Sequence, residues 1–195
     1  MTDSSQAEIF WRSFNDGLYR IPRAWVHQGT LLRNSFEAIA KASNPDSLTG
    51  NINNPALMLA GMSLENYLKA IILHRCREQG SSGIPIGFMI HDLVKLASSA
   101  KVTFSPKQNA TAKALTQYIT WRGRYVAPIA SSYSDHMPVD FDIPLEGDAF
   151  ATKGGAHRYA TISSARDLIE YVVSIVKLHI YGNKESDKWW VFGCV

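Results

Sequence analysis

Apolar residues recur every three or four positions along most of this chain of 195 residues, which is the spacing of one face of an α-helix. The pattern predicts four long helices, at about 22–41, 54–79, 106–125 and 163–181. A short helix at His91–Ala97 is expected between the second and third of these, and an extra amphipathic helix at about 7–21 is expected before them. The fold class is therefore expected to be all-α, an antiparallel bundle of four to five helices.

Two charged residues interrupt the apolar row of the helix expected at 54–79. Glu65 and Lys69 lie one turn apart in a row that is otherwise Met58, Met62, Ile72 and Cys76. In solvent such a pair contributes about 0.3–0.5 kcal/mol, whereas a buried pair would form a polar seam in the bundle core or at a subunit interface. Because charged side chains usually stay solvated, we favour a half-exposed pair.

Capping residues indicate where several of these helices begin. Asn54 precedes a proline, and Ser105 is followed three positions later by Gln108, which is the capping-box spacing. His91 and Asp92 open the short helix, where an anion is favoured by the helix dipole, and a helix cap is their simplest interpretation.

The segment at 128–161 has no helical period and is expected to be a long loop before the last helix. Alternating apolar and acidic residues at Val139–Ile143 predict one short strand or the arm of a hairpin there. The tail at 183–195 contains Trp189, Trp190 and Phe192, and we expect these rings to pack on the bundle or on a second subunit.

Composition places the chain among ordinary globular domains, with 46% hydrophobic and 19% charged residues. We expect one domain over 1–195 with its core at about 22–182. Glu65 and Lys69 also argue against a membrane span in the most apolar stretch. Cys76 and Cys194 lack Cys-x-x-Cys spacing, so reduced thiols in the cytoplasm are expected, without a metal site or a cofactor.

Charge is distributed unevenly along the chain. Residues 60–125 hold nine Lys and Arg against three Asp and Glu, a balance of +6, whereas residues 126–195 hold six against nine, a balance of −3. A basic middle can serve phosphate binding or self-association. The sequence carries no Walker-type or dinucleotide-type glycine loop, no Gly-x-Ser-x-Gly and no His-Glu-x-x-His, so the corresponding enzyme classes are set aside.

Three short motifs resemble those of HEPN domains, namely Glu65-x-x-Leu68-Lys69-Ala70, His91-Asp92-Leu93 and Arg124-Tyr125. The resemblance covers about 22–182. It implies a helical bundle, usually a homodimer, of the kind found in toxin–antitoxin, abortive-infection and CRISPR-linked proteins. Many members are metal-independent ribonucleases and others are non-catalytic modules. It also implies RNA or a nucleotide, or a cognate nucleotidyltransferase or antitoxin-like protein, as partners, and Glu65, Lys69, His91, Asp92 and Tyr125 as binding or interface residues.

Active HEPN ribonucleases carry an Arg followed, after four to six residues, by a His. Arg122 or Arg124 could supply the cation that holds the scissile phosphate, but the next histidine is His136. We therefore expect a non-catalytic module that binds a partner protein or nucleic acid. A ribonuclease in which a loop histidine, His136 or His157, completes the site is the alternative, and a purely structural oligomerisation protein is the third hypothesis.

Overall fold

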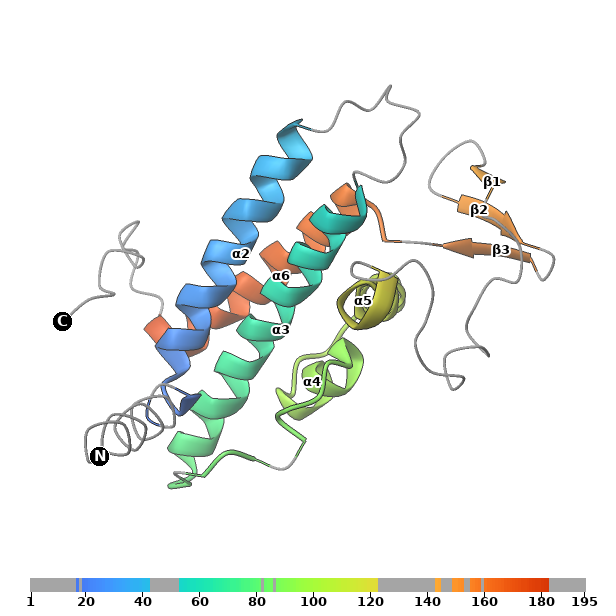
Figure 1. Ribbon diagram of the computed structural model, residues 1–195. Coiled ribbons are helices and arrows are strands. Elements are labelled where there is room, and N and C mark those ends of the chain that lie inside the picture. The colour runs from blue at the N-terminus through green and yellow to red at the C-terminus, as the bar shows by residue number, and fades with distance from the viewer. Residues whose placement is uncertain are drawn as a thin grey trace, which may run out of the picture.

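The computed structural model describes residues 17, 19–42, 53–81, 83–85, 87–122, 143–144, 149–152, 155–158 and 160–182. Most of these residues are helical, which confirms the all-α class (Figure 1). The helices are α2 (Pro22–Ala42), α3 (Asn53–Glu78), α4 (Leu93–Ser99), α5 (Pro106–Gln117) with its π-helical continuation η1 (Tyr118–Arg122), and α6 (Ile162–Tyr181). The helix expected at about 7–21 lies almost entirely outside the described residues, as does the tail at 183–195.

Two helices begin at capping boxes, whereas α3 begins at Asn53 and therefore includes Asn54, which was expected before its start. Ser105 caps α5 with both hydrogen bonds of the capping box, and Thr161 caps α6 in the same way through Ser164. α4 begins at Leu93 rather than at His91, because Asp92 takes the N-cap position and is itself extended.

The third long helix differs from its prediction at the C-terminal end. An α-helix was expected over 106–125, but α-helical geometry ends at Gln117 and a π-helical turn follows from Tyr118 to Arg122. The hydroxyl of Thr120 donates to the Thr116 carbonyl oxygen at 2.8 Å. Apolar periodicity cannot distinguish these two geometries, because both keep neighbouring turns on one face.

α3 is the central helix of the fold, and α2, α4, α5 and α6 all contact it (Figure 1). Its side chains are buried on nearly every side, including Leu64, Leu68 and Ile71, which have no exposed surface. A helix that is apolar all round belongs in the interior of a protein.

α2 and α3 pack closely and run antiparallel, since Gly29 lies beside Ser63 and Tyr67 while Trp25 lies beside Lys69. The Ser63 hydroxyl donates to the Gly29 carbonyl oxygen at 2.8 Å. A Cβ on Gly29 would come within 3.0 Å of the Tyr67 ring, so glycine is what allows this approach. Burial raises the pKa of Tyr67 above its usual value of 10.0, which keeps the phenol neutral.

α6 also runs antiparallel to α2, and two ion pairs join these helices. The Arg166 guanidinium donates to both carboxylate oxygens of Glu37 at 2.8 Å. Arg33, one turn before Glu37 on α2, pairs with Glu170, one turn after Arg166 on α6. The hydrogen bond from Arg166 lowers the pKa of Glu37 below its usual value of 4.5. This contribution to stability is therefore present above pH 4.5 and is lost as the pH falls through the lowered pKa.

The segment expected as a long loop contains a small antiparallel sheet. Its strands are β1 (Ile143–Pro144), β2 (Ala149–Thr152) and β3 (Gly155–Arg158), in the order β1-β2-β3. Figure 1 shows this sheet beside the helices, with α6 following it along the chain. The strand signal at Val139–Ile143 thus touches β1 only at Ile143, and residues 139–142 lie outside the described part of the chain. Strands this short lack the periodic run that sequence patterns detect.

Within the residues that the structure describes, one helix is long and apolar enough to cross a membrane. The segment is Pro55–Glu78 of α3. Its most apolar window of 18 residues has a mean hydropathy of 1.3, and 78% of that window is buried inside the protein. Burial on that scale is what the core helix of a soluble protein requires.

Candidate functional site

Glu65 and Lys69 form a buried ion pair on α3. The Lys69 ammonium donates to the Glu65 carboxylate at 2.7 Å, and the two residues are 3% and 7% exposed, respectively. The half-exposed interpretation favoured from the sequence is therefore wrong. Burial results from side chains that arrive from distant parts of the chain and cover this face of α3.

Two aromatic rings enclose the Lys69 ammonium. Its Nζ lies 5.3 Å from the ring centroids of both Trp25 on α2 and Phe88 in the segment between α3 and α4. The two rings contact each other edge to face, with centroids 5.1 Å apart. A cation over aromatic faces is attracted by their negative potential, and the attraction grows as water is excluded. The rings and the Glu65 carboxylate together replace the water that the buried ammonium has lost.

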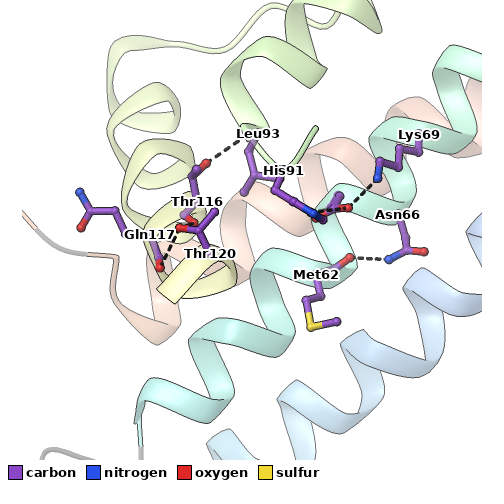
Figure 2. Close-up of polar contacts among 9 residues, drawn as sticks. Met62, Asn66, Lys69, His91, Leu93, Thr116, Gln117 and Thr120 are labelled. Carbon is purple, nitrogen blue, oxygen red and sulfur yellow. Dashed lines mark hydrogen bonds and ion pairs between the residues drawn. The ribbon is translucent and has the colours of Figure 1, made fainter. Parts of the chain in front are cut away.

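The Glu65 carboxylate has a second partner in His91, whose Nδ1 lies 3.1 and 3.0 Å from its two oxygens. Figure 2 shows the side chains of His91 and Lys69 pointing toward one another beside α3. The His91 side chain is 55% exposed, so its imidazole is the member of this trio that has substantial solvent contact. Glu65 thereby ties the middle of α3 to the segment that leads into α4.

Asp92 serves as the N-cap of α4, as the sequence indicated. Its Oδ1 accepts hydrogen bonds from the backbone N–H groups of Val94 and Lys95, each at 3.0 Å. The backbone N–H of Leu93, the first residue of α4, donates to the Thr116 hydroxyl of α5 at 3.1 Å (Figure 2). The start of α4 is therefore fixed by its own cap and by a contact with the neighbouring helix.

The chemistry open to this cluster follows from exposure. The imidazole of His91 and the carboxylate of Glu65 share a hydrogen bond, and only the imidazole is open to solvent. Lys69 cannot reach a phosphate in solution while its ammonium is held between two rings and a carboxylate. The arrangement acts as an internal clamp with one solvent-facing imidazole, and breaking it would leave a charge buried without a partner.

The proposed catalytic residues are not brought together within the described residues. Arg122 is the last residue of η1, and Arg124, Tyr125 and His136 lie outside the described part of the chain. His157 lies in β3, opposite Phe150 in the register of the sheet. A catalytic role for these residues stays a prediction.

Sequence reasoning missed the aromatic cover of Lys69 and the role of Thr116. Trp25 lies on the apolar row of its helix, at a spacing typical of core residues, and Phe88 lies in a segment without helical periodicity. Neither position indicates a cation partner by itself, because Trp25 is 44 positions and Phe88 is 19 positions away from Lys69 in the sequence. Among the described residues there is no group of three His, Cys, Asp or Glu side chains suited to a metal ion.

Comparison with protein-family models, curated proteins and solved structures finds no match for this chain. The resemblance to HEPN domains accordingly rests on the three sequence motifs alone. Two of those motifs, around Glu65 and His91, meet in space through the hydrogen bond between these residues.

Proposed function

We propose that this protein is a HEPN-like helical module that binds a partner protein or nucleic acid, in a prokaryotic defence, stress or toxin–antitoxin context, without cleaving RNA. One observation carries the non-catalytic part of the proposal. No histidine follows Arg122 or Arg124 at the spacing of four to six residues that active HEPN ribonucleases show. The charged pair of the longest motif, Glu65 and Lys69, is buried and engaged in the fold. An antiparallel HEPN-like bundle is proposed with it, supported by the antiparallel courses of α2 and α3 and of α2 and α6.

The charge on α4 and α5 favours a nucleic acid as the partner. Residues 93–121 contain no Asp or Glu, and Lys95, Lys107 and Lys113 of these helices are exposed. Asp92, the acid just before this stretch, caps α4 and also pairs with Lys95 at 3.5 Å, so the support for a nucleic acid comes from Lys107 and Lys113. Exposed lysines without nearby acids neutralise phosphates and release counterions, which is the main source of non-specific affinity for nucleic acids.

The alternative function is a metal-independent endoribonuclease. It would use Arg122 or Arg124 to hold the scissile phosphate and His136 or His157 to move the proton of the ribose 2′-OH. A third hypothesis is a structural oligomerisation protein, in which the Glu65–Lys69 pair only fixes how α3 packs.

Single-stranded RNA incubated with the EDTA-treated protein separates these functions. We expect the RNA to stay intact over hours while it binds, with an affinity that falls as salt rises. Replacing Lys107 and Lys113 with Ala should reduce the slope of log K against log salt by about 1.4, since each phosphate contact contributes about 0.7 for a single strand. Lys41→Ala, an exposed lysine at the end of α2, is the matched control and should leave the slope unchanged.

Cleavage that disappears in Arg122→Ala or Arg124→Ala would overturn the non-catalytic proposal. General acid–base catalysis contributes about 10²–10⁴-fold to a rate, so loss of an essential partner would be plain in a gel assay. Absence of both cleavage and RNA binding would favour a protein partner or the structural hypothesis.

A further inference from the structure

A small pocket lies between the C-terminal part of α3 and the C-terminal end of α4. Its volume is about 130 Å³. The lining residues are Ile72, Arg75, Cys76, Gln79, Pro85, Gly87, Phe88, Ser99 and Lys101. The lining thus combines an apolar part with two cations and contains no acidic side chain. Pockets for drug-sized ligands span about 300–1,000 Å³, so this one suits a compact molecule.

The positive charge of Arg75 is not neutralised within the described residues. Its Nε is buried and has no hydrogen-bond acceptor there. Its Nη2 lies 3.5 Å from Nε2 of His179 on α6. An imidazole carries no negative charge, so this contact does not neutralise the guanidinium. Because the Nε is covered by the protein, an anion in the pocket would act on the charge of the guanidinium group as a whole.

Lys101 occupies a backbone position that normally belongs to glycine. α4 ends with hydrogen bonds from Val102 N to Ala97 O at 2.8 Å and from Lys101 N to Ser98 O at 2.9 Å. The same pair of bonds ends α3, where Gly80 takes the left-handed position with φ 75°. In α4 that position is held by Lys101, with φ 51°. A side chain in this conformation is strained, and such strain is found where a side chain serves a site.

The partial negative charge at the C-terminus of a helix favours a cation nearby, but it does not explain why lysine rather than glycine takes the left-handed position at 101. The last carbonyl groups of α4 already accept the two backbone hydrogen bonds, and glycine would satisfy the same geometry without strain. Lys101 is exposed, lines the pocket and has no ion pair with any other residue that the structure describes. Its ammonium is therefore free to meet a ligand at the mouth of the pocket.

We propose that this pocket binds a small carboxylic acid with a compact apolar body. The carboxylate pairs with Arg75 and Lys101, since a planar guanidinium matches a carboxylate in geometry and charge. The apolar body lies against Ile72 and Phe88. This site is distinct from the proposed nucleic-acid face, and its failure would leave that proposal untouched.

Benzoate is the probe, with benzamide as its neutral isostere. Titration of the full chain followed by ¹⁵N–¹H NMR should give saturable shifts around Ile72, Arg75 and Phe88 with a Kd on the order of 1 mM, which is typical for a ligand of so few atoms. Benzamide should bind with an affinity at least about tenfold lower, because it lacks the negative charge. Equal shifts with both compounds, or none with benzoate, would refute an anion site.

Lys101→Gly separates loss of binding from loss of folding. Removing the left-handed lysine should leave the melting temperature unchanged or raise it by about 2–4 °C. Benzoate affinity should nevertheless fall about tenfold, the effect expected for one charged hydrogen bond. Arg75→Gln should lower the affinity for benzoate by at least as much. Arg77→Gln should not lower it, because Arg77 is an exposed cation that does not line the pocket. Unchanged affinity in both Lys101→Gly and Arg75→Gln would overturn the proposal.

Cys76 gives a second, independent readout because it is a free cysteine among the residues that line the pocket. Benzoate at saturation should slow alkylation of Cys76 by iodoacetamide, and peptide mass spectrometry distinguishes it from Cys194. In Lys101→Gly the protection should disappear at the same benzoate concentration. Equal protection by benzamide would indicate an apolar site without anion recognition and would contradict the proposal.

Discussion

At the scale of single residues, Lys69 shows what a buried charge needs in order to be tolerated. Its ammonium has one carboxylate and two aromatic rings as neighbours, and it keeps 3% of its surface exposed. Desolvating two charges costs several kcal/mol, which close pairing only partly offsets. Such a pair adds little net stability, but the loss of one partner is severe.

The prediction at this scale is that Lys69→Met destabilises the protein by about 3–5 kcal/mol, because the Glu65 carboxylate is then buried without its cation. The double variant Glu65→Leu with Lys69→Met should recover most of that loss, since neither charge remains. Chemical denaturation at pH 7 measures both free energies of unfolding.

The effect of Lys69→Met on the free energy of unfolding can be compared with that of His91→Ala, which removes the other partner of Glu65. The imidazole is 55% exposed, so its hydrogen bond to Glu65 should contribute only about 0.5–1.5 kcal/mol. If Lys69→Met cost less than His91→Ala, the clamp described for Lys69 would be incorrect.

At the scale of elements, the contact of α3 with η1 depends on Gly61. A Cβ at this position would lie 2.7 Å from Cγ1 of Ile119 and 3.2 Å from the carbonyl oxygen of Leu115. Neither atom can move freely, because one is near the start of a buried side chain and the other belongs to the backbone. The π-helical turn that carries Ile119 therefore packs directly against the backbone of α3.

We predict that Gly61→Ala lowers the free energy of unfolding by about 1–3 kcal/mol through overpacking. The effect should appear although alanine favours a helix by about 1 kcal/mol over glycine. In an Ile119→Ala background the penalty should vanish or reverse, because the clashing atom is gone. A double-mutant cycle from urea unfolding measures this coupling, and purely additive effects would show that the two helices do not meet at Gly61.

At the scale of the whole molecule, the open question is assembly. Leu31 on α2 and Leu178 on α6 are about half exposed in the single chain. The aromatic tail with Trp189, Trp190 and Phe192 adds further apolar side chains outside the described residues. Exposed apolar surface of this kind often marks a contact with a second subunit. The Glu65–Lys69 pair, by contrast, is covered within one chain.

We predict that the protein is a homodimer whose contact includes the tail. Light scattering at high micromolar concentration should give twice the mass of one chain. Replacing Trp189 and Trp190 together with Ala should shift the mass toward that of one chain, because the contact loses its largest apolar side chains. Replacing Lys184 and Lys188 of the same tail with Ala is the matched control. A monomeric mass for the unaltered protein would rule the dimer out.

Much of the helical content could be predicted from local sequence. The boundaries of α2, α3 and α6 fall within one residue of those expected, since apolar periodicity, prolines and capping side chains act over a few neighbouring residues. Asp92 was likewise identified as a cap from its position alone. The three motifs suggested a family, but a motif does not specify which of its side chains stay in contact with solvent.

What the sequence determined by itself is therefore the helical class, the ends of α2, α3 and α6, and the caps Asp92 and Ser105, because these depend on interactions between residues close together in the chain. Only the tertiary structure decided that Glu65 and Lys69 are buried, that α5 passes into a π-helical turn, and that Arg75 and Lys101 share a pocket. Each of these depends on side chains that distant segments supply, as Trp25 and Phe88 do for Lys69. Burial and close packing are properties of the folded chain, and the local sequence of a helix does not specify which distant segment will cover that helix.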